Sequence, residues 1–218
     1  MIEPPIKAAV LPVTPYQQNC SLVWCTATKR AAVVDPGGDL DRLKKLIAAQ
    51  GVTLEKVLLT HGHLDHASGA TKLAREFGVK IEGPHKDDLF LLEELGRNKV
   101  RPGLGDAEDC LPDRWLEDGD TITVGEAVFG VRHCPGHTPG HVVIYNEAVR
   151  IAFVGDVLFR GSVGRTDFPR GNHQQLVDSI TQRLWPLGDD ITFVPGHGDT
   201  STFGWERKTN PYVSDLAL

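Results

Sequence analysis

One ten-residue stretch, THGHLDHASG (Thr60–Gly69), constrains this chain more than any other part of its 218 residues. It places three histidines and one aspartate within six residues, directly after a short apolar run. Such a run predicts a buried strand, and residues two apart at the end of a strand can point to the same place. We therefore expect His61 and His63 to hold one metal ion. Asp65 and His66 follow as the chain enters a predicted helix, so they suit a second ion.

Imidazole and carboxylate groups are the ligands that zinc and the neighbouring first-row metals accept in proteins. The alternative interpretation is a polar turn with solvated histidines, which is common for one histidine and disfavoured for four metal-competent side chains at this density. The stretch therefore predicts half of a two-metal site.

Three later strand ends each carry a metal-competent residue inside a glycine-rich turn. These residues are His137 in CPGHTPGH, Asp156 in VGD and His197 in VPGHG. A single histidine or aspartate in a turn is ordinarily a cap or a surface residue. Because side chains at the same edge of a sheet converge in space, the three turns together with the first cluster indicate one shared site.

Hydrophobic periodicity predicts an alternation of strands and helices, typical of a layered α/β protein, and the two strand-rich halves predict two sheets. The predicted strands are Ile6–Val13, Cys20–Thr26, Ala31–Val34, Leu54–Leu59, Val79–Glu82, Thr121–Val124, Ala127–His133, His141–Tyr145, Arg150–Val154 and Ile191–Val194. The predicted helices are Asp39–Gln50, Ala70–Phe77, His85–Gly96, Asn172–Leu184 and Ser201–Lys208.

Length and composition set further expectations. A chain of 218 residues fits one domain, 1–218, and no apolar run approaches the ~20 residues of a membrane span. The formal net charge of −6 argues against a nucleic-acid partner, since nucleic-acid binding needs an excess of Lys and Arg. The proline-broken N-terminus does not read as a secretory signal, and the four cysteines form no CxxC pair. We expect a cytoplasmic protein with structural cysteines; no feature of the sequence indicates an oligomeric state.

The order of these motifs resembles that of the metallo-β-lactamase superfamily, which has HxHxDH, then His, then Asp, then His. The resemblance implies an α/β fold of four layers (αββα), with two mixed β-sheets and helices on both outer faces. It also implies that Asp35, in the early turn DPGG, supports the ligands without binding a metal. His141, in HTPGH, is expected to brace the turn that carries His137 through a hydrogen bond. The implied metal ligands are His61, His63 and His137 for one ion, Asp65, His66 and His197 for the other, and Asp156 as the bridge.

Within the superfamily, CPGHTPGH and GDVLF resemble the glyoxalase II (hydroxyacylglutathione hydrolase) branch, and FRGSVGRTDFPRG resembles its compact single-domain members of the YcbL type. The resemblance implies a thioesterase that cleaves S-acylglutathione, such as lactoylglutathione, by attack of a metal-bound hydroxide held near Asp65 and Asp156. Arg165 matches a basic residue that binds glutathione. The aromatic residue expected two positions later is replaced by Asp167, so Phe168 becomes the candidate contact.

Several alternatives stay open at this point. A persulfide dioxygenase of the same fold, with a single iron, has a similar motif set, whereas a nuclease is disfavoured by the net charge. Two divalent ions are expected, with zinc as the default and iron or manganese possible, because mixed His and carboxylate sites accept all three. The larger glyoxalase II enzymes add a helical domain with further glutathione-binding residues; without it, we expect a more open pocket.

Overall fold

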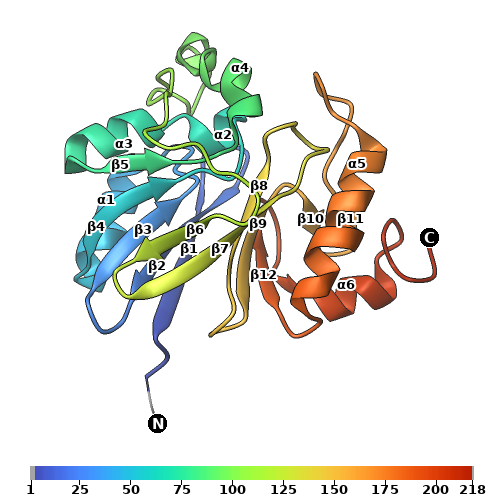
Figure 1. The fold of residues 1–218 in the computed structure, drawn as a ribbon. Helices are drawn as coiled ribbons and strands as arrows, with labels where there is room; N and C mark the ends of the chain where they lie inside the picture. The colour runs from blue at the N-terminus through green and yellow to red at the C-terminus, as the bar shows by residue number, and fades with distance from the viewer. Residues whose placement is uncertain (1–2, 218) are drawn as a thin grey trace.

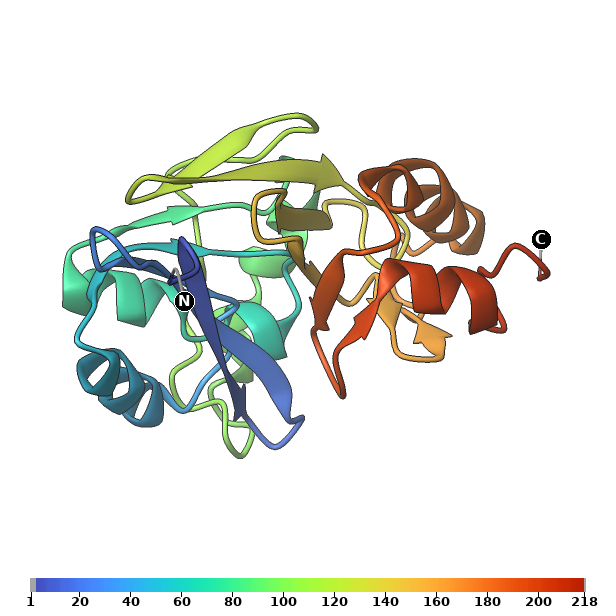
Figure 2. The same cartoon turned by 90° about the horizontal axis from the view of Figure 1, so that it is seen from below.

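The structure, a computed structural model, describes residues 3–217 and contains two mixed β-sheets packed face to face, with helices outside them (Figures 1 and 2). The first sheet has the order β1 (Ile6–Val13), β2 (Gln18–Cys25), β3 (Arg30–Val34), β4 (Thr53–Leu58) and β5 (Lys80–Glu82). Its first three strands run antiparallel, and β3, β4 and β5 run parallel.

The second sheet has the order β13 (Ser201–Thr202), β12 (Thr192–Pro195), β9 (Ile151–Gly155), β8 (Val142–Asn146), β7 (Ala127–His133) and β6 (Thr121–Val124). Strands β9 and β12 run parallel, and the other neighbours run antiparallel. A separate hairpin is formed by β10 (Leu158–Phe159) and β11 (Ser162–Val163).

Helices cover the outer face of each sheet (Figure 1). Beside the first sheet lie α1 (Leu40–Gln50), α2 (Leu64–Ala67) and α3 (Ala70–Phe77), with α4 (Leu89–Leu92) above them. Beside the second sheet lie α5 (His173–Asp178), which continues as a π-helix over Ser179–Leu184, and α6 (Phe203–Thr209). Within residues 3–217, no helix is long and apolar enough to cross a membrane.

The period of two along the strands explains why both sheets are buried on both faces. In β3, Ala31 and Val33 pack with α1 and α3, whereas Ala32 and Val34 pack against the second sheet. Strands of the second sheet divide their side chains in the same way between the α5 and α6 side and the space between the sheets. Two mixed sheets with helices on both outer faces confirm the predicted fold class.

The prediction of one continuous helix over His85–Gly96 is wrong. The segment is instead a 3₁₀ turn (Lys86–Asp88), the short helix α4 and a second 3₁₀ turn (Leu95–Asn98). Contacts with a distant segment replace helical hydrogen bonds: the Leu92 carbonyl accepts from the backbone N–H of Cys110 (3.0 Å), and the backbone N–H of Gly96 donates to the Asp109 carboxylate (2.6 Å). The two-residue strands β10, β11 and β13 were not predicted, because runs this short carry no measurable periodicity.

Candidate metal centre

The candidate centre lies at one edge of the sandwich, where chain segments from both sheets end. The cluster His61–His66 follows β4 and leads into α2, with His63 directly before its first residue. From the second sheet come His137 in the β7–β8 connection, Asp156 directly after β9 and His197 shortly after β12. All seven candidate ligands therefore arise at strand ends, as the sequence predicted.

The first group of ligands consists of three histidines. One ring nitrogen each from His61, His63 and His137 lies within 4.8 Å of the other two. The Nε2 atom of His137 is 2.9 Å from Nδ1 of His63, and Nε2 of His61 is buried without a hydrogen-bond partner among the described residues. Three imidazole nitrogens that converge in this way fit a single cation.

The second group consists of Asp65, His66 and His197, whose ligand atoms also lie within 4.8 Å of one another. The Oδ2 atom of Asp65 is 3.1 Å from Nε2 of His197 and 3.8 Å from Nε2 of His66. Two imidazoles and a carboxylate again make a donor set that suits a divalent first-row metal.

The Asp156 carboxylate joins the two groups. Its Oδ1 atom is 3.3 Å from Nε2 of His66, and its Oδ2 atom is 3.5 Å from Nε2 of His137 and 3.7 Å from Nε2 of His197. Oδ1 is buried and has no hydrogen-bond donor among residues 3–217. One carboxylate with an oxygen facing each group has the placement of a bridge between two cations.

The outward-facing nitrogens of His61, His66, His137 and His197 are bonded to protein acceptors. These bonds hold the rings in place and turn the opposite nitrogens inward, as metal ligation requires. The pairs are His66 Nδ1 with Asp35 Oδ2 (2.9 Å), His137 Nδ1 with the Arg165 carbonyl (2.8 Å), His197 Nδ1 with the Tyr16 carbonyl (3.0 Å) and His61 Nδ1 with Thr60 Oγ1 (3.1 Å).

Electrostatics give the two groups of histidines different protonation states. Burial, together with the neighbouring imidazoles, lowers the pKa of His61 well below its usual value and that of His63 to about 3, so both rings are neutral. Burial alone would raise the pKa of Asp156, but nearby His66, His137 and His197 more than offset it and hold that pKa well below its usual range. Burial would also lower the pKa values of His66 and His197, but the Asp156 and Asp65 carboxylates outweigh it and raise both. At neutral pH the metal-free site therefore has neutral His61 and His63, an ionised Asp156, and protons on His66 and His197 that a metal ion would displace.

Asp35 occupies a supporting position of the kind the resemblance implied. Its carboxylate accepts hydrogen bonds from the backbone N–H and the hydroxyl of Thr60 (2.7 and 2.6 Å) as well as from His66. The side chain is almost fully buried, and the backbone has a positive φ of 53°. The DPGG turn thus aims one carboxylate at the base of the ligand cluster.

His141 is also adjacent to the ligands, but its hydrogen bond differs from the one expected. It was predicted to brace the turn that carries His137. Instead, its Nε2 atom accepts from the backbone N–H of Asp156 (3.0 Å), and its ring stacks on that of His61 with the centroids 4.5 Å apart. Gly155 makes this approach possible, because it has a φ of 49° and a Cβ there would lie 2.6 Å from the His141 ring.

Asp88 is a residue of the site that sequence reasoning missed. Its fully buried carboxylate accepts from the backbone N–H of Gly62 (2.9 Å), the Thr138 hydroxyl (2.8 Å) and the backbone N–H of Gly140 (2.6 Å). It therefore ties the turn of His61 and His63 to the turn of His137. A signal was available, since Asp88 stands four and seven residues before the apolar Leu92 and Leu95, where a helical pattern expects a buried apolar side chain.

A cavity of about 630 Å³ opens beside the ligands. Arg165 and Phe168, the two predicted substrate contacts, both line it. The Phe168 ring centroid is 4.8 Å from that of His63, and the Arg165 guanidinium lies 4.6 Å from the Phe168 centroid. Arg165 is also paired with Asp167, at 2.8 and 3.0 Å. The remaining lining includes residues that the sequence did not single out, namely Tyr16, Arg101, Phe159, Ser162 and Val163.

Comparisons with known proteins agree with this geometry. Residues 13–197 match the family model of the metallo-beta-lactamase superfamily. The chain is 45% identical over 206 residues to hydroxyacylglutathione hydrolase GloC of Haemophilus influenzae. The aligned region covers 94% of this chain and 97% of that protein. Among solved structures, it is similar to the BLEG-1 B3 metallo-beta-lactamase, with 31% identity, a TM-score of 0.85, and coverage of 95% of this chain and 99% of that one.

It is also similar to TTHA1623, solved in a di-iron-bound form, with 36% identity, a TM-score of 0.80, and coverage of 94% of this chain and 100% of that one. The family match extends over most of the chain and includes every strand end that carries a candidate ligand. This chain is a metal-dependent hydrolase and belongs to the metallo-beta-lactamase superfamily.

Proposed function

We propose that this hydrolase is a glyoxalase II-like thioesterase that cleaves S-acylglutathione, for example lactoylglutathione. The observation that carries the proposal is the Asp156 carboxylate, which lies between two groups of ligands at the floor of a cavity that Arg165 also lines. The printed name of the Haemophilus influenzae relative supports the same substrate class.

We assign two divalent cations to the centre. His61, His63 and His137 would hold one, Asp65, His66 and His197 the other, and Asp156 both. Buried atoms that lack a protein partner support the assignment, since His61 Nε2, His66 Nε2 and Asp156 Oδ1 all face inward without a hydrogen bond among the described residues. Zinc is the default metal; the donor set accepts iron or manganese equally well.

When bound, such a pair of cations supplies a hydroxide nucleophile from water near neutral pH and polarises a carbonyl oxygen. The protein's own residues provide position and charge. Asp65 and Asp156 place two ionised carboxylates next to the imidazoles, and Asp35 and His141 hold His66 and Asp156 in orientation. The Phe168 ring makes edge contacts with the His63 and His137 rings and places an apolar surface beside the site. The thiolate of a cleaved thioester is stable enough to leave without a side-chain proton donor.

Metal analysis combined with a substrate panel tests the proposal. We expect two metal ions per chain and faster hydrolysis of lactoylglutathione than of unrelated acyl thioesters. Asp156→Ala should lose most of the activity, because the shared ligand is removed, and unchanged turnover would refute its role. Equal rates on all thioesters would remove glutathione from the proposal.

The alternative, a persulfide dioxygenase with a single iron, gives a different result in the same experiment. One iron per chain and oxygen consumption on glutathione persulfide would favour it, whereas two metals and thioester cleavage without oxygen uptake would favour the hydrolase.

We further propose that residues 1–218 form one domain and that the partner of this domain is a small-molecule thioester. A cytoplasmic location stays a prediction, supported by four buried cysteines that form no disulfide. Burial raises the pKa of the Cys20, Cys110 and Cys134 thiols, which suits a structural rather than a reactive role.

A further inference from the structure

Two arginines line the cavity beside the ligand cluster, and only one of them is paired with a carboxylate. The Arg165 guanidinium is neutralised by a bidentate pair with Asp167 and lies over Phe168. Arg101 makes no ion pair and no side-chain hydrogen bond with any residue in the range 3–217. The cavity therefore contains an arginine whose full positive charge is available to a bound molecule.

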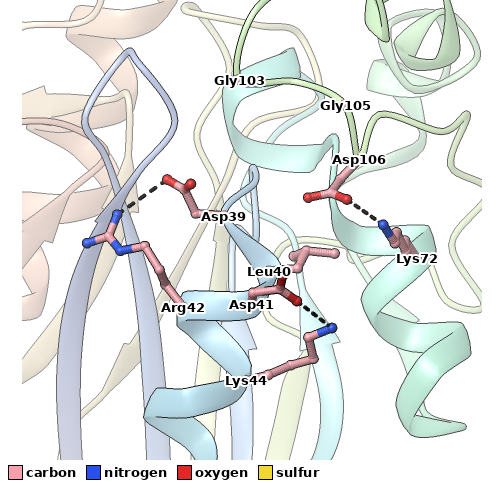
Figure 3. A pocket seen from close by; sticks show the side chains of 9 residues that line it. All are labelled: Asp39, Leu40, Asp41, Arg42, Lys44, Lys72, Gly103, Gly105 and Asp106. Atoms are coloured by element: carbon pink, nitrogen blue, oxygen red, sulfur yellow. Dashed lines mark hydrogen bonds and ion pairs between the residues drawn. The ribbon is translucent and has the colours of Figure 1, made fainter.

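A neighbouring hollow shows the contrast (Figure 3). It is also lined by charged side chains, but each cation there has a carboxylate partner: Arg42 pairs with Asp39, Lys44 with Asp41 and Lys72 with Asp106. A cation that already pairs with a carboxylate of the protein attracts a bound anion less than an unpaired cation does. The cations of this hollow therefore already have carboxylate partners, whereas Arg101 has none among residues 3–217.

Several contacts fix the segment that carries Arg101. The Lys72–Asp106 pair (2.6 Å) attaches this segment to α3, and Leu104 is fully buried. Gly103, with a φ of 78°, packs so closely on Pro15 that a Cβ would collide with the proline ring. The backbone N–H of Leu104 donates to the Arg101 carbonyl (3.1 Å). The position of Arg101 at the cavity is therefore set by several independent contacts.

We propose that Arg101 is a specificity-determining residue that binds a carboxylate on the thiol half of the substrate. The inference rests on the proposed thioesterase function. A guanidinium presents paired N–H donors that match a carboxylate, so a free arginine at a cavity selects for carboxylate-bearing ligands. Glutathione carries two carboxylates and a lactoyl group carries none, so the anion that reaches Arg101 belongs to the leaving thiol.

The test compares Arg101→Gln with the wild-type protein on two thioesters that share one acyl group. The first is lactoylglutathione, and the second is the lactoyl thioester of N-acetylcysteamine, whose thiol half is uncharged. We expect Arg101→Gln to raise KM for lactoylglutathione about tenfold with little change in kcat, as the loss of a charged hydrogen bond would. The uncharged thioester should be unaffected. Lys99→Gln is the matched control, because it removes the same charge from the same segment at a residue that does not line the cavity.

Binding of S-methylglutathione, a thioether that cannot be hydrolysed, gives a readout that is independent of turnover. Titration calorimetry of the metal-loaded protein should show about tenfold weaker binding to Arg101→Gln and unchanged binding to Lys99→Gln. If Arg101→Gln impairs both thioesters equally, or leaves S-methylglutathione binding unchanged, the inference is wrong. A wild-type protein that hydrolyses neither thioester but binds S-methylglutathione through Arg101 would overturn the proposed function and leave this inference standing.

Discussion

Asp88 places a carboxylate between the two turns that supply one group of ligands. Its three hydrogen bonds reach Gly62, which separates His61 from His63, and Thr138 and Gly140, which follow His137. Asp88→Asn should weaken metal binding about 10- to 100-fold, because an amide nitrogen would replace one acceptor oxygen and face a donor, and groups that orient ligands typically have effects of this size. Competition with a chelator measures the change.

Asp87→Asn is the control for this variant. Asp87 is the exposed neighbour of Asp88 and accepts none of the three bonds, so its substitution changes the charge of the same segment without releasing either turn. Equal metal affinities for the two variants would show that the tie between the turns has no effect on the ligands.

The burial of Asp88 also makes the stability of the protein depend on pH. It raises the pKa of this carboxyl from 3.8 to about 6. Because the folded protein holds this proton more tightly than the unfolded chain, the stability from protonated Asp88 is complete below pH ~4 and is lost as pH rises through about 6. For the metal-free protein, the free energy of unfolding of the wild type relative to Asp88→Asn should fall by about 2 kcal/mol from pH 4 to 7. Denaturant titrations across this range check it, and a pH-independent difference would contradict it.

The residues that sequence reasoning found and missed differ in how far their contacts reach. The candidate ligands could be identified, and their convergence predicted, because each is a metal-competent side chain at the end of a recognisable strand. Asp88 acts through partners 26 to 52 residues away, and Arg101 through its lack of any partner. The bond from His141 to Asp156 depends on how Gly155 turns. None of these relations is visible in local spacing.

Among the elements, the longer strands and the helices whose hydrogen bonds close within the helix agreed best with the sequence pattern. Helix α1 shows this well, because Leu40, Leu43 and Ile47 recur at helical spacing and Gly51 ends the helix with a φ of 61°. The His85–Gly96 segment failed because Cys110 and Asp109 take over its backbone groups. Periodicity reports which face is buried, and it cannot report that a distant segment supplies the hydrogen bonds.

The end of β12 places a glycine directly against the carboxylate of Asp156, the proposed bridge. A Cβ on Gly196 would collide with Oδ1 of Asp156 and lie 2.7 Å from Cε1 of His66. Gly196→Ala should therefore displace both ligands and reduce metal affinity at least tenfold, in line with other changes that misorient ligands. Metal content after dialysis and chelator competition measure this loss.

Gly198→Ala separates the collision from backbone strain. Gly198 has a φ of 77°, but a Cβ there would meet open space. Its substitution should cost about 1 kcal/mol of stability through the left-handed backbone while it leaves the ligands in place. If Gly198→Ala lost metal to the same extent as Gly196→Ala, strain at the end of β12 would be the cause.

At the scale of the whole molecule, the centre connects the two sheets. His61, His63, Asp65 and His66 follow β4 of the first sheet, and the other three ligands follow strands of the second. Elsewhere the sheets meet through an apolar interface that includes Val34, Leu58, Phe129, Ile144 and Phe153. The layered arrangement was predictable from the alternation of strands and helices and from the family resemblance. How one polar edge joins the two sheets could be seen only in the structure.

Removal of the metals should therefore destabilise the whole chain and not one segment. A ligand that binds only the folded state at a concentration of 1,000 Kd adds about 4 kcal/mol, which for a chain of this size corresponds to about 8–16 °C in Tm. We expect a chelator to lower Tm by this order, with one cooperative transition before and after, as a single domain over 1–218 requires. In Asp156→Ala, which removes the group between the two sets of ligands, the chelator should change Tm much less. Differential scanning calorimetry measures both quantities. Two separate transitions in the metal-free protein would contradict the prediction, because they would show that the sheets unfold independently and that the metals act on one of them alone.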